Sequence, residues 1–128
     1  SYRHSAYEDS GLVITAASVR LTPGDPEQIK NTMHDIISRR RDKQPLEYPS
    51  AGSTFKRPEG HFAGALIEQC GLKGVSVGGA QVSEKHAGFI INRGGATASD
   101  ILSLIKHVQA RVKAQTGVTL ETEIRLIG

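Results

Sequence analysis

Hydrophobic positions along the chain recur three and four residues apart in three segments, which predicts three helices with one apolar face each. Asp25 and Pro26 precede the first stripe, and Thr97 or Ser99 precedes the third; these residue types favour helix N-termini. Gly117 follows the last apolar position of the third stripe and predicts its end. The predicted helices cover about 25–41, 60–71 and 99–117.

Shorter apolar runs rich in β-branched residues predict strands between and outside these helices. Residues 118–127 alternate between an apolar face and a face that carries Glu121, Glu123 and Arg125. The predicted strands are 12–21, 75–82, 87–92 and 118–127. Helices mixed with such strands predict an α+β fold, in which a mixed or antiparallel sheet is covered by helices.

The segment 43–58, KQPLEYPSAGSTFKRP, contains three prolines around a small-residue turn and predicts a rigid loop. Such a loop could hold Ser53, Lys56 and Arg57 toward an anion, because lysine and arginine neutralise carboxylates and phosphates. The alternative is a proline-fixed connection with a solvated basic end, since loops of this composition are common and usually carry no chemistry.

Length and composition are those of one ordinary domain: 128 residues, 38% hydrophobic and 23% charged. The net charge of +3, with three tyrosines, three phenylalanines and no tryptophan, argues against a nucleic-acid binder. No apolar run is long enough to span a membrane, so no membrane partner is expected. A single cysteine excludes an internal disulfide framework and fits a reducing, cytoplasmic setting.

Several reactive side chains have an ordinary structural explanation beside a functional one. Cys70 lies on the apolar stripe of the second helix, which favours a core residue over a nucleophile. Glu121 and Glu123 would form a solvated strand face with Arg125. The five histidines lack the HxxxH and HxH spacings of metal ligands, so no metal site is predicted.

The basic run at the end of the first helix also has two interpretations. Arg39, Arg40, Arg41 and Lys43 would offset the negative end of the helix dipole. Alternatively, one or two of them reach a phosphate beside the proline-rich loop.

Five motifs in order resemble the bacterial UDP-N-acetylenolpyruvoylglucosamine reductase family, the MurB family, over essentially the whole chain. The form of the YPSAGSTFKRP loop is similar to the subclass that lacks an extra tyrosine loop. The motifs are YRHS (2–5), KQPLEYPSAGSTFKRP (43–58), GLKG (71–74), GGAQVSEKHAGFIIN (78–92) and LETEIRLIG (120–128).

The resemblance implies a flavoenzyme that takes hydride from NADPH onto FAD. Such an enzyme then reduces UDP-N-acetylglucosamine enolpyruvate to UDP-N-acetylmuramate for peptidoglycan synthesis. Hydride adds to the vinyl carbon remote from the carboxylate, so the adjacent carbon becomes carbanionic and must be stabilised and protonated. A positioned acid typically contributes about 10²–10⁴-fold to such a step.

The resemblance also assigns roles to residues. It implies that Ser53 donates the proton and that Arg3 and Glu123 act on the substrate carboxylate. Arg40 would lie near flavin, although Arg39 or Arg41 could take that place. The positions implied to hold substrate are Tyr2, Lys43, Lys56, Arg57 and His86; some relatives have asparagine and glutamine at the last two.

The resemblance divides the chain into the end of an FAD-binding region (1–22), a substrate-binding domain (23–118) and a strand returning to the FAD-binding region (119–128). The main FAD-binding segment would precede Ser1, which is not a methionine, so we expect a fragment that is inactive without the rest of its polypeptide. Two alternatives stay open: a non-catalytic module for UDP-sugars or other diphosphates, and a different FAD-dependent oxidoreductase.

Overall fold

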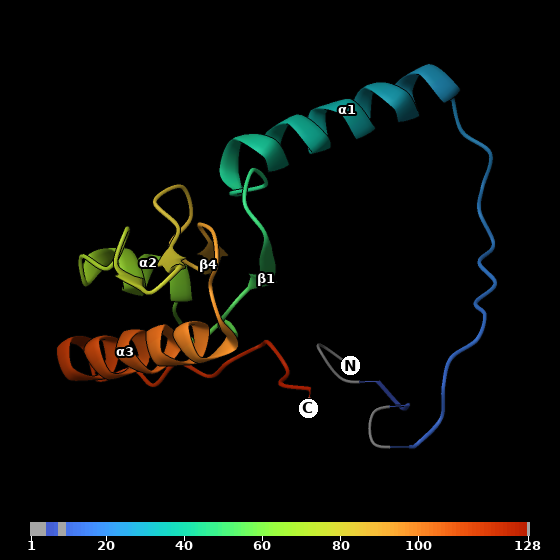
Figure 1. Cartoon of the computed structure of the whole chain (residues 1–128). Coiled ribbons are helices and arrows are strands. Elements are labelled where there is room, and N and C mark those ends of the chain that lie inside the picture. Colours follow the sequence, from blue (N-terminus) through green and yellow to red (C-terminus); the bar gives the residue numbers. More distant parts are fainter. Residues whose placement is uncertain (1–4, 8–9, 128) are drawn as a thin grey trace. The chain divides into compact units, whose positions relative to one another are not determined.

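The computed structural model describes residues 5–7 and 10–127 (Figure 1). Internal contacts divide the chain into two units, 1–33 and 34–128, and each is considered by itself. Tyr2 and Arg3, two of the residues predicted to act on substrate, lie outside the described residues.

The first predicted helix is confirmed as α1, Pro26–Lys43. The carboxylate of Asp25 accepts a hydrogen bond from the N–H of Gln28 at 2.7 Å, as expected for a residue that caps a helix. Arg40, Arg41 and Lys43 occupy the last turn, where they complement the helix dipole. No residue of α1 is buried, and the apolar side chains of its stripe are exposed.

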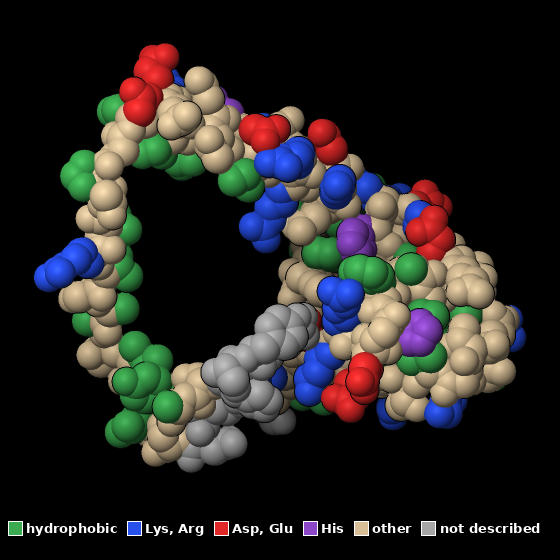
Figure 2. All heavy atoms as spheres, turned by 180° about the vertical axis from the view of Figure 1, so that it is seen from behind, with side chains coloured by type: hydrophobic (Ala, Val, Ile, Leu, Met, Phe, Trp, Pro, Cys, Tyr) green, Lys and Arg blue, Asp and Glu red, His purple; other side chains and the backbone are tan. Residues whose placement is uncertain are grey.

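The predicted strand at residues 12–21 is wrong, because the structure has no regular element there. Its apolar side chains are exposed, Val13 to 84% and Leu21 to 82%, and hydrophobic side chains stand out along this segment in Figure 2. A strand forms only where a neighbouring strand satisfies its backbone and covers one face. The described residues provide no such neighbour for this segment, although its composition is right for a strand.

An antiparallel four-stranded sheet forms the centre of the 34–128 unit, in the order β1-β4-β3-β2. Residues Val82 and Ile90 are register partners at the middle of the sheet. The α+β class with an antiparallel sheet is therefore confirmed. The strands are β1 (Ser50–Ser53), β2 (Ser76–Val77), β3 (Ala80–Val82) and β4 (Phe89–Asn92).

The second and third predicted helices are α2, Ala63–Gln69, and α3, Ala98–Thr116. α3 contacts β2, β3 and α2. Leu104 and Val108 of α3 are completely buried, as is Ile67 of α2. Cys70 is also buried in this core, which confirms its structural assignment.

The predicted strand at 118–127 is also wrong, because only Thr122 makes a β-bridge, to Phe55. Two backbone bonds join this segment to residues 54–56: the N–H of Lys56 donates to the carbonyl of Glu121, and the N–H of Glu123 donates to the carbonyl of Thr54. Leu120 is buried beneath this short pairing. The alternating pattern is real, but the pairing is too short for a strand.

A capping box begins α3, and it makes stability depend on pH. The N–H of Thr97 donates to the Asp100 carboxylate at 2.9 Å, and the Thr97 hydroxyl oxygen accepts from the N–H of Asp100 at 3.1 Å. Hydrogen bonds to the carboxylate, first from the Thr97 backbone N–H and then from the Thr97 side chain, hold the pKa of Asp100 below its ordinary value. Because the pKa of Asp100 is lower in the folded than in the unfolded state, its ionised carboxylate stabilises the fold at pH values above the unfolded-state pKa. This stabilisation is lost as the pH falls through the folded-state pKa.

We therefore expect the free energy of unfolding to fall more steeply below about pH 4 in the native chain than in Asp100→Asn, which does not titrate. Urea unfolding measured at a series of pH values, followed by circular dichroism, checks this difference. Parallel stability curves for the two proteins would contradict it.

Candidate functional site

The serine of the proline-rich segment lies at the end of a strand. Residues 50–53 form β1 and pair with β4, so the prediction of a loop is wrong at these positions. The register shifts between Ser50 and Ser53, and Gly52 has a positive φ of 87°, which glycine adopts without strain. Such a bulge re-aims the side chain that follows it. The exposed Ser53 hydroxyl donates to the carbonyl of Phe55 at 3.3 Å.

Residues 54–56 run antiparallel to residues 121–123 near the end of the chain. The N–H of Lys56 donates to the carbonyl of Glu121 at 2.8 Å, and the N–H of Glu123 donates to that of Thr54 at 2.9 Å. The segment after Ser53 is therefore hydrogen-bonded to the segment that holds Glu123. Two predicted site residues that are far apart in the sequence lie on adjoining backbone segments.

His86 belongs to a turn that is hydrogen-bonded to the 54–56 segment through Thr54. The N–H of Thr54 donates to the carbonyl of Gly88 at 2.9 Å. The N–H of Gly88 in turn donates to Nδ1 of His86 at 3.1 Å, and the half-buried His86 ring packs edge-on against Phe89 with centroids 5.0 Å apart. The ring is thus fixed by its own turn.

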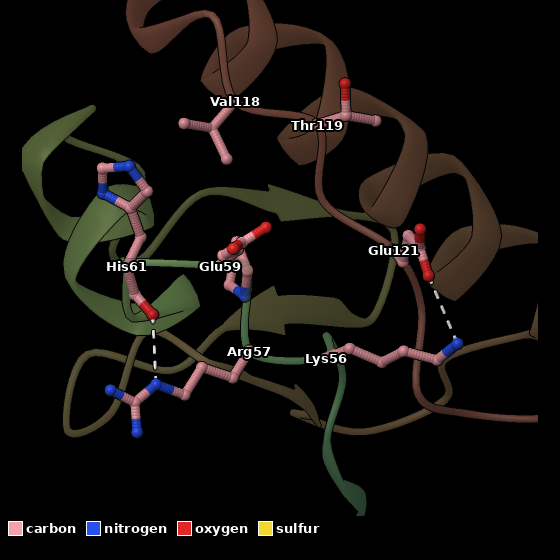
Figure 3. A pocket seen from close by; sticks show the side chains of 8 residues that line it. Lys56, Arg57, Glu59, His61, Val118, Thr119 and Glu121 are labelled. Carbon is pink, nitrogen blue, oxygen red and sulfur yellow. Dashed lines mark hydrogen bonds and ion pairs between the residues drawn. The ribbon is translucent and has the colours of Figure 1, made fainter. Parts of the chain in front are cut away.

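A pocket of about 410 Å³ lies beside this junction (Figure 3). The side chains of Lys56 and Arg57 extend in opposite directions, as expected for consecutive residues of extended backbone. Acidic and basic groups both line the pocket, so it can hold a ligand that is anionic and also rich in hydrogen-bond donors. The lining residues are Lys56, Arg57, Pro58, Glu59, His61, Val118, Thr119 and Glu121.

Both cations of the pocket have partners within the chain. Lys56 Nζ lies 3.2 Å from the Glu121 carboxylate, and Arg57 Nε donates to the carbonyl of His61 at 3.3 Å. The Arg57 guanidinium also lies 4.0 Å from the centre of the Phe62 ring. An exposed ion pair such as Lys56–Glu121 contributes less than about 1 kcal/mol, so an anionic ligand can compete for the ammonium group.

The structure does not bring every predicted residue to this junction. Arg40 and Lys43 lie in the last turn of α1 and do not line the pocket, and Arg40 Nε donates to the side chain of Gln44 at 3.0 Å. Ser53, His86 and Glu123 are joined to the junction through backbone bonds but do not line the pocket either.

Sequence reasoning missed two residues at this junction. Thr54, 3% exposed, accepts a hydrogen bond from the N–H of Ile90 through its hydroxyl oxygen at 3.1 Å. His61 lines the pocket and supplies the carbonyl that Arg57 contacts. No spacing or composition signal marks either residue, because both are placed by pairing between distant segments.

Basic and acidic side chains are interspersed on the visible face of the 34–128 unit in Figure 2. Within the described part of the chain, no helix combines the length and apolar character needed to cross a bilayer. Among residues 5–7 and 10–127, no three His, Cys, Asp or Glu side chains are grouped as metal ligands.

Fold and site together define a small α+β domain in which a serine, two cations and two carboxylates are grouped along one paired segment. Residues 44–127 match the model of the C-terminal domain of UDP-N-acetylenolpyruvoylglucosamine reductase. That match covers more than half of the chain, and the chain therefore belongs to this family.

Relatives named UDP-N-acetylenolpyruvoylglucosamine reductase show how much of such a protein is present. The protein from Clostridium perfringens is 58% identical over 99% of this chain and 42% of its own length. The protein from Agathobacter rectalis is 57% identical over 100% of this chain and 41% of its own length. The crystal structure of the Thermus caldophilus enzyme (MurB) is 37% identical, with a TM-score of 0.67 over 83% of this chain and 37% of that chain. This chain thus spans about two fifths of the length of these relatives.

Proposed function

We propose that this chain is the substrate-binding part of a cytoplasmic reductase that converts UDP-N-acetylglucosamine enolpyruvate to UDP-N-acetylmuramate for peptidoglycan synthesis. Family membership supports the reaction class. The observation that carries the proposal is the pairing of residues 54–56 with 121–123, which places Ser53 and Glu123 on adjoining segments.

The proposal assigns the remainder of the active protein to a longer polypeptide. Residues 1–22 are the end of its FAD-binding region, residues 23–118 bind substrate, and residues 119–128 return to the FAD-binding region. The chain covers 42% and 41% of the lengths of two relatives, which supports a longer polypeptide. The chain alone is then inactive.

Ser53 protonates the carbanionic carbon next to the substrate carboxylate. Arg3 pairs with that carboxylate as its charge increases, and Glu123 acts on it by hydrogen bonding or as an acid. Preorganised charge of this kind is usually the larger contribution to catalysis, and proton donation adds to it. The flavin, when bound, supplies the hydride that comes from NADPH.

Among the described residues, the proposal places only Arg40 near the flavin. Arg40 offers a guanidinium group that suits a phosphate, but it is exposed and lies outside the pocket. The role of this chain toward the flavin is therefore limited to a contact from Arg40. The cradle belongs to the longer polypeptide.

Substrate is held by the diphosphate or sugar contacts of Tyr2, Lys43, Lys56, Arg57 and His86. We expect Arg57→Met in the full-length protein to raise KM for the UDP-sugar about tenfold while kcat changes less than about twofold, because a contact made equally in ground and transition states affects KM alone. Steady-state kinetics measures both constants.

Lys73→Met is the matched control for Arg57→Met. Lys73 pairs with Glu68 at 2.6 Å and does not line the pocket. Its removal should leave KM unchanged. A kcat loss equal to the KM change in Arg57→Met would contradict a purely binding role.

The visible absorption spectrum of the full-length protein tests the function as a whole. Flavin bands that bleach with NADPH and return anaerobically with the UDP-enolpyruvyl sugar are expected. Absence of flavin would favour a non-catalytic UDP-sugar or diphosphate module. Flavin that bleaches but is not reoxidised by this sugar would favour a different oxidoreductase.

A further inference from the structure

Thr54 is a polar residue that is 3% exposed at the point where three segments meet. Its N–H donates to the carbonyl of Gly88 at 2.9 Å, and its carbonyl accepts from the N–H of Glu123 at 2.9 Å. Its hydroxyl oxygen accepts from the N–H of Ile90 at 3.1 Å. One residue therefore bonds the turn of His86, strand β4 and the segment of Glu123.

The bulge in β1 explains why a hydroxyl is needed here. The register between β1 and β4 shifts between Ser50 and Ser53, so the regular ladder of backbone bonds is interrupted. The buried N–H of Ile90 is satisfied by the Thr54 side chain in place of a strand carbonyl. A buried N–H without an acceptor is costly, and the backbone would move to recover one.

The position of Thr54 makes such movement important. Ser53 is its immediate neighbour, and Glu123 is hydrogen-bonded to its carbonyl. A proton donor and a group that stabilises developing charge must keep their separation to within about 0.5 Å to act on the same substrate. The bonds from Thr54 to β4 and its turn, and to the segment of Glu123, fix that separation.

We propose that Thr54 is the positioning residue of the site: its hydroxyl holds the bulged segment against β4 and thereby sets Ser53 relative to Glu123 and His86. This inference rests on the proposed function. It adds a residue that does not touch substrate and acts through Ser53.

The test is Thr54→Val in the full-length flavin-loaded protein, since valine has nearly the shape of threonine but cannot accept a hydrogen bond. Stopped-flow absorbance separates flavin reduction by NADPH from flavin reoxidation by the UDP-enolpyruvyl sugar. Reoxidation should slow at least about tenfold while reduction changes less than about twofold, because misplacement by a fraction of an ångström affects only the step at Ser53. Thr54→Ser, which restores the hydroxyl, should recover most of the rate.

Hydrogen–deuterium exchange gives a second readout that does not depend on turnover. Amides in the peptides covering residues 88–92 and 121–125 should exchange faster in Thr54→Val and normally in Thr54→Ser. Thr97→Val is the control: it removes the cap of α3 and so destabilises the domain, but should leave reoxidation unchanged.

A native rate of flavin reoxidation in Thr54→Val would overturn the inference. An equal loss of reoxidation rate in Thr54→Val and Thr97→Val would overturn it as well. Failure of the unsubstituted protein to be reoxidised by the sugar would instead refute the proposed function. If Thr54→Val does not purify with flavin, Thr54→Cys takes its place, because a thiol is a weaker acceptor of similar size. Native reoxidation in Thr54→Cys would equally overturn the inference.

Discussion

Ser53→Ala in the full-length protein is expected to lower the rate of flavin reoxidation by the UDP-enolpyruvyl sugar by about 10²–10⁴-fold, the usual contribution of a positioned acid. Flavin reduction by NADPH should be unchanged, because no proton from Ser53 enters that half-reaction. Substrate affinity should change little, since the exposed hydroxyl makes a long hydrogen bond of 3.3 Å to the carbonyl of Phe55 and its removal disturbs little structure. Anaerobic stopped-flow absorbance measures the two half-reactions separately.

Ser50→Ala provides the matched control for Ser53→Ala. Ser50 lies on the same strand, is exposed, and accepts a long hydrogen bond of 3.4 Å from the N–H of Gly52. Removal of this hydroxyl should leave both half-reactions at the native rate. Equal losses in both half-reactions of Ser53→Ala would contradict its role as proton donor, as would equal losses in the two variants.

The three helices could be predicted from the sequence because their signals are local. Asp25 caps α1, Thr97 caps α3, and Gly117 ends α3 in the left-handed conformation. Each signal lies within a few residues of the element that it defines. Tertiary contacts were not needed to place these helices.

The strands depended on partners that the sequence does not identify. Residues 12–21 have strand composition without a strand, whereas the Ser-Ala-Gly-Ser of β1 has poor strand composition and forms one because β4 pairs with it. Pairing between distant segments also brings Ser53 and Glu123 together, which spacing could not indicate. Family resemblance suggested those two residues, but it gave no sign of Thr54, whose role follows from the bulge.

Gly79→Ala is expected to cause the largest loss of stability among the single-methyl additions to the sheet. A Cβ at Gly79 would lie 2.4 Å from the carbonyl oxygen of Gly94 and 2.5 Å from the N–H nitrogen of Ala96. Both are backbone atoms, and the Asn92 side chain accepts from the N–H groups of Gly94 and Ala96 at 2.8 and 3.1 Å, so the turn is held in place. We expect a loss of about 3 kcal/mol, at the upper end for overpacking.

Gly60→Ala separates this clash from the general cost of replacing glycine. Gly60 has a positive φ of 71° but nothing within 4 Å of an added Cβ. Only backbone strain remains there, which costs about 1–2 kcal/mol. Urea unfolding of the two variants, followed by circular dichroism, should therefore give a lower midpoint for Gly79→Ala. Equal midpoints would mean that the 92–96 turn can move aside. Because this turn directly follows β4, whose Phe89 is the register partner of Ser53, such freedom would also loosen the support of the proposed site.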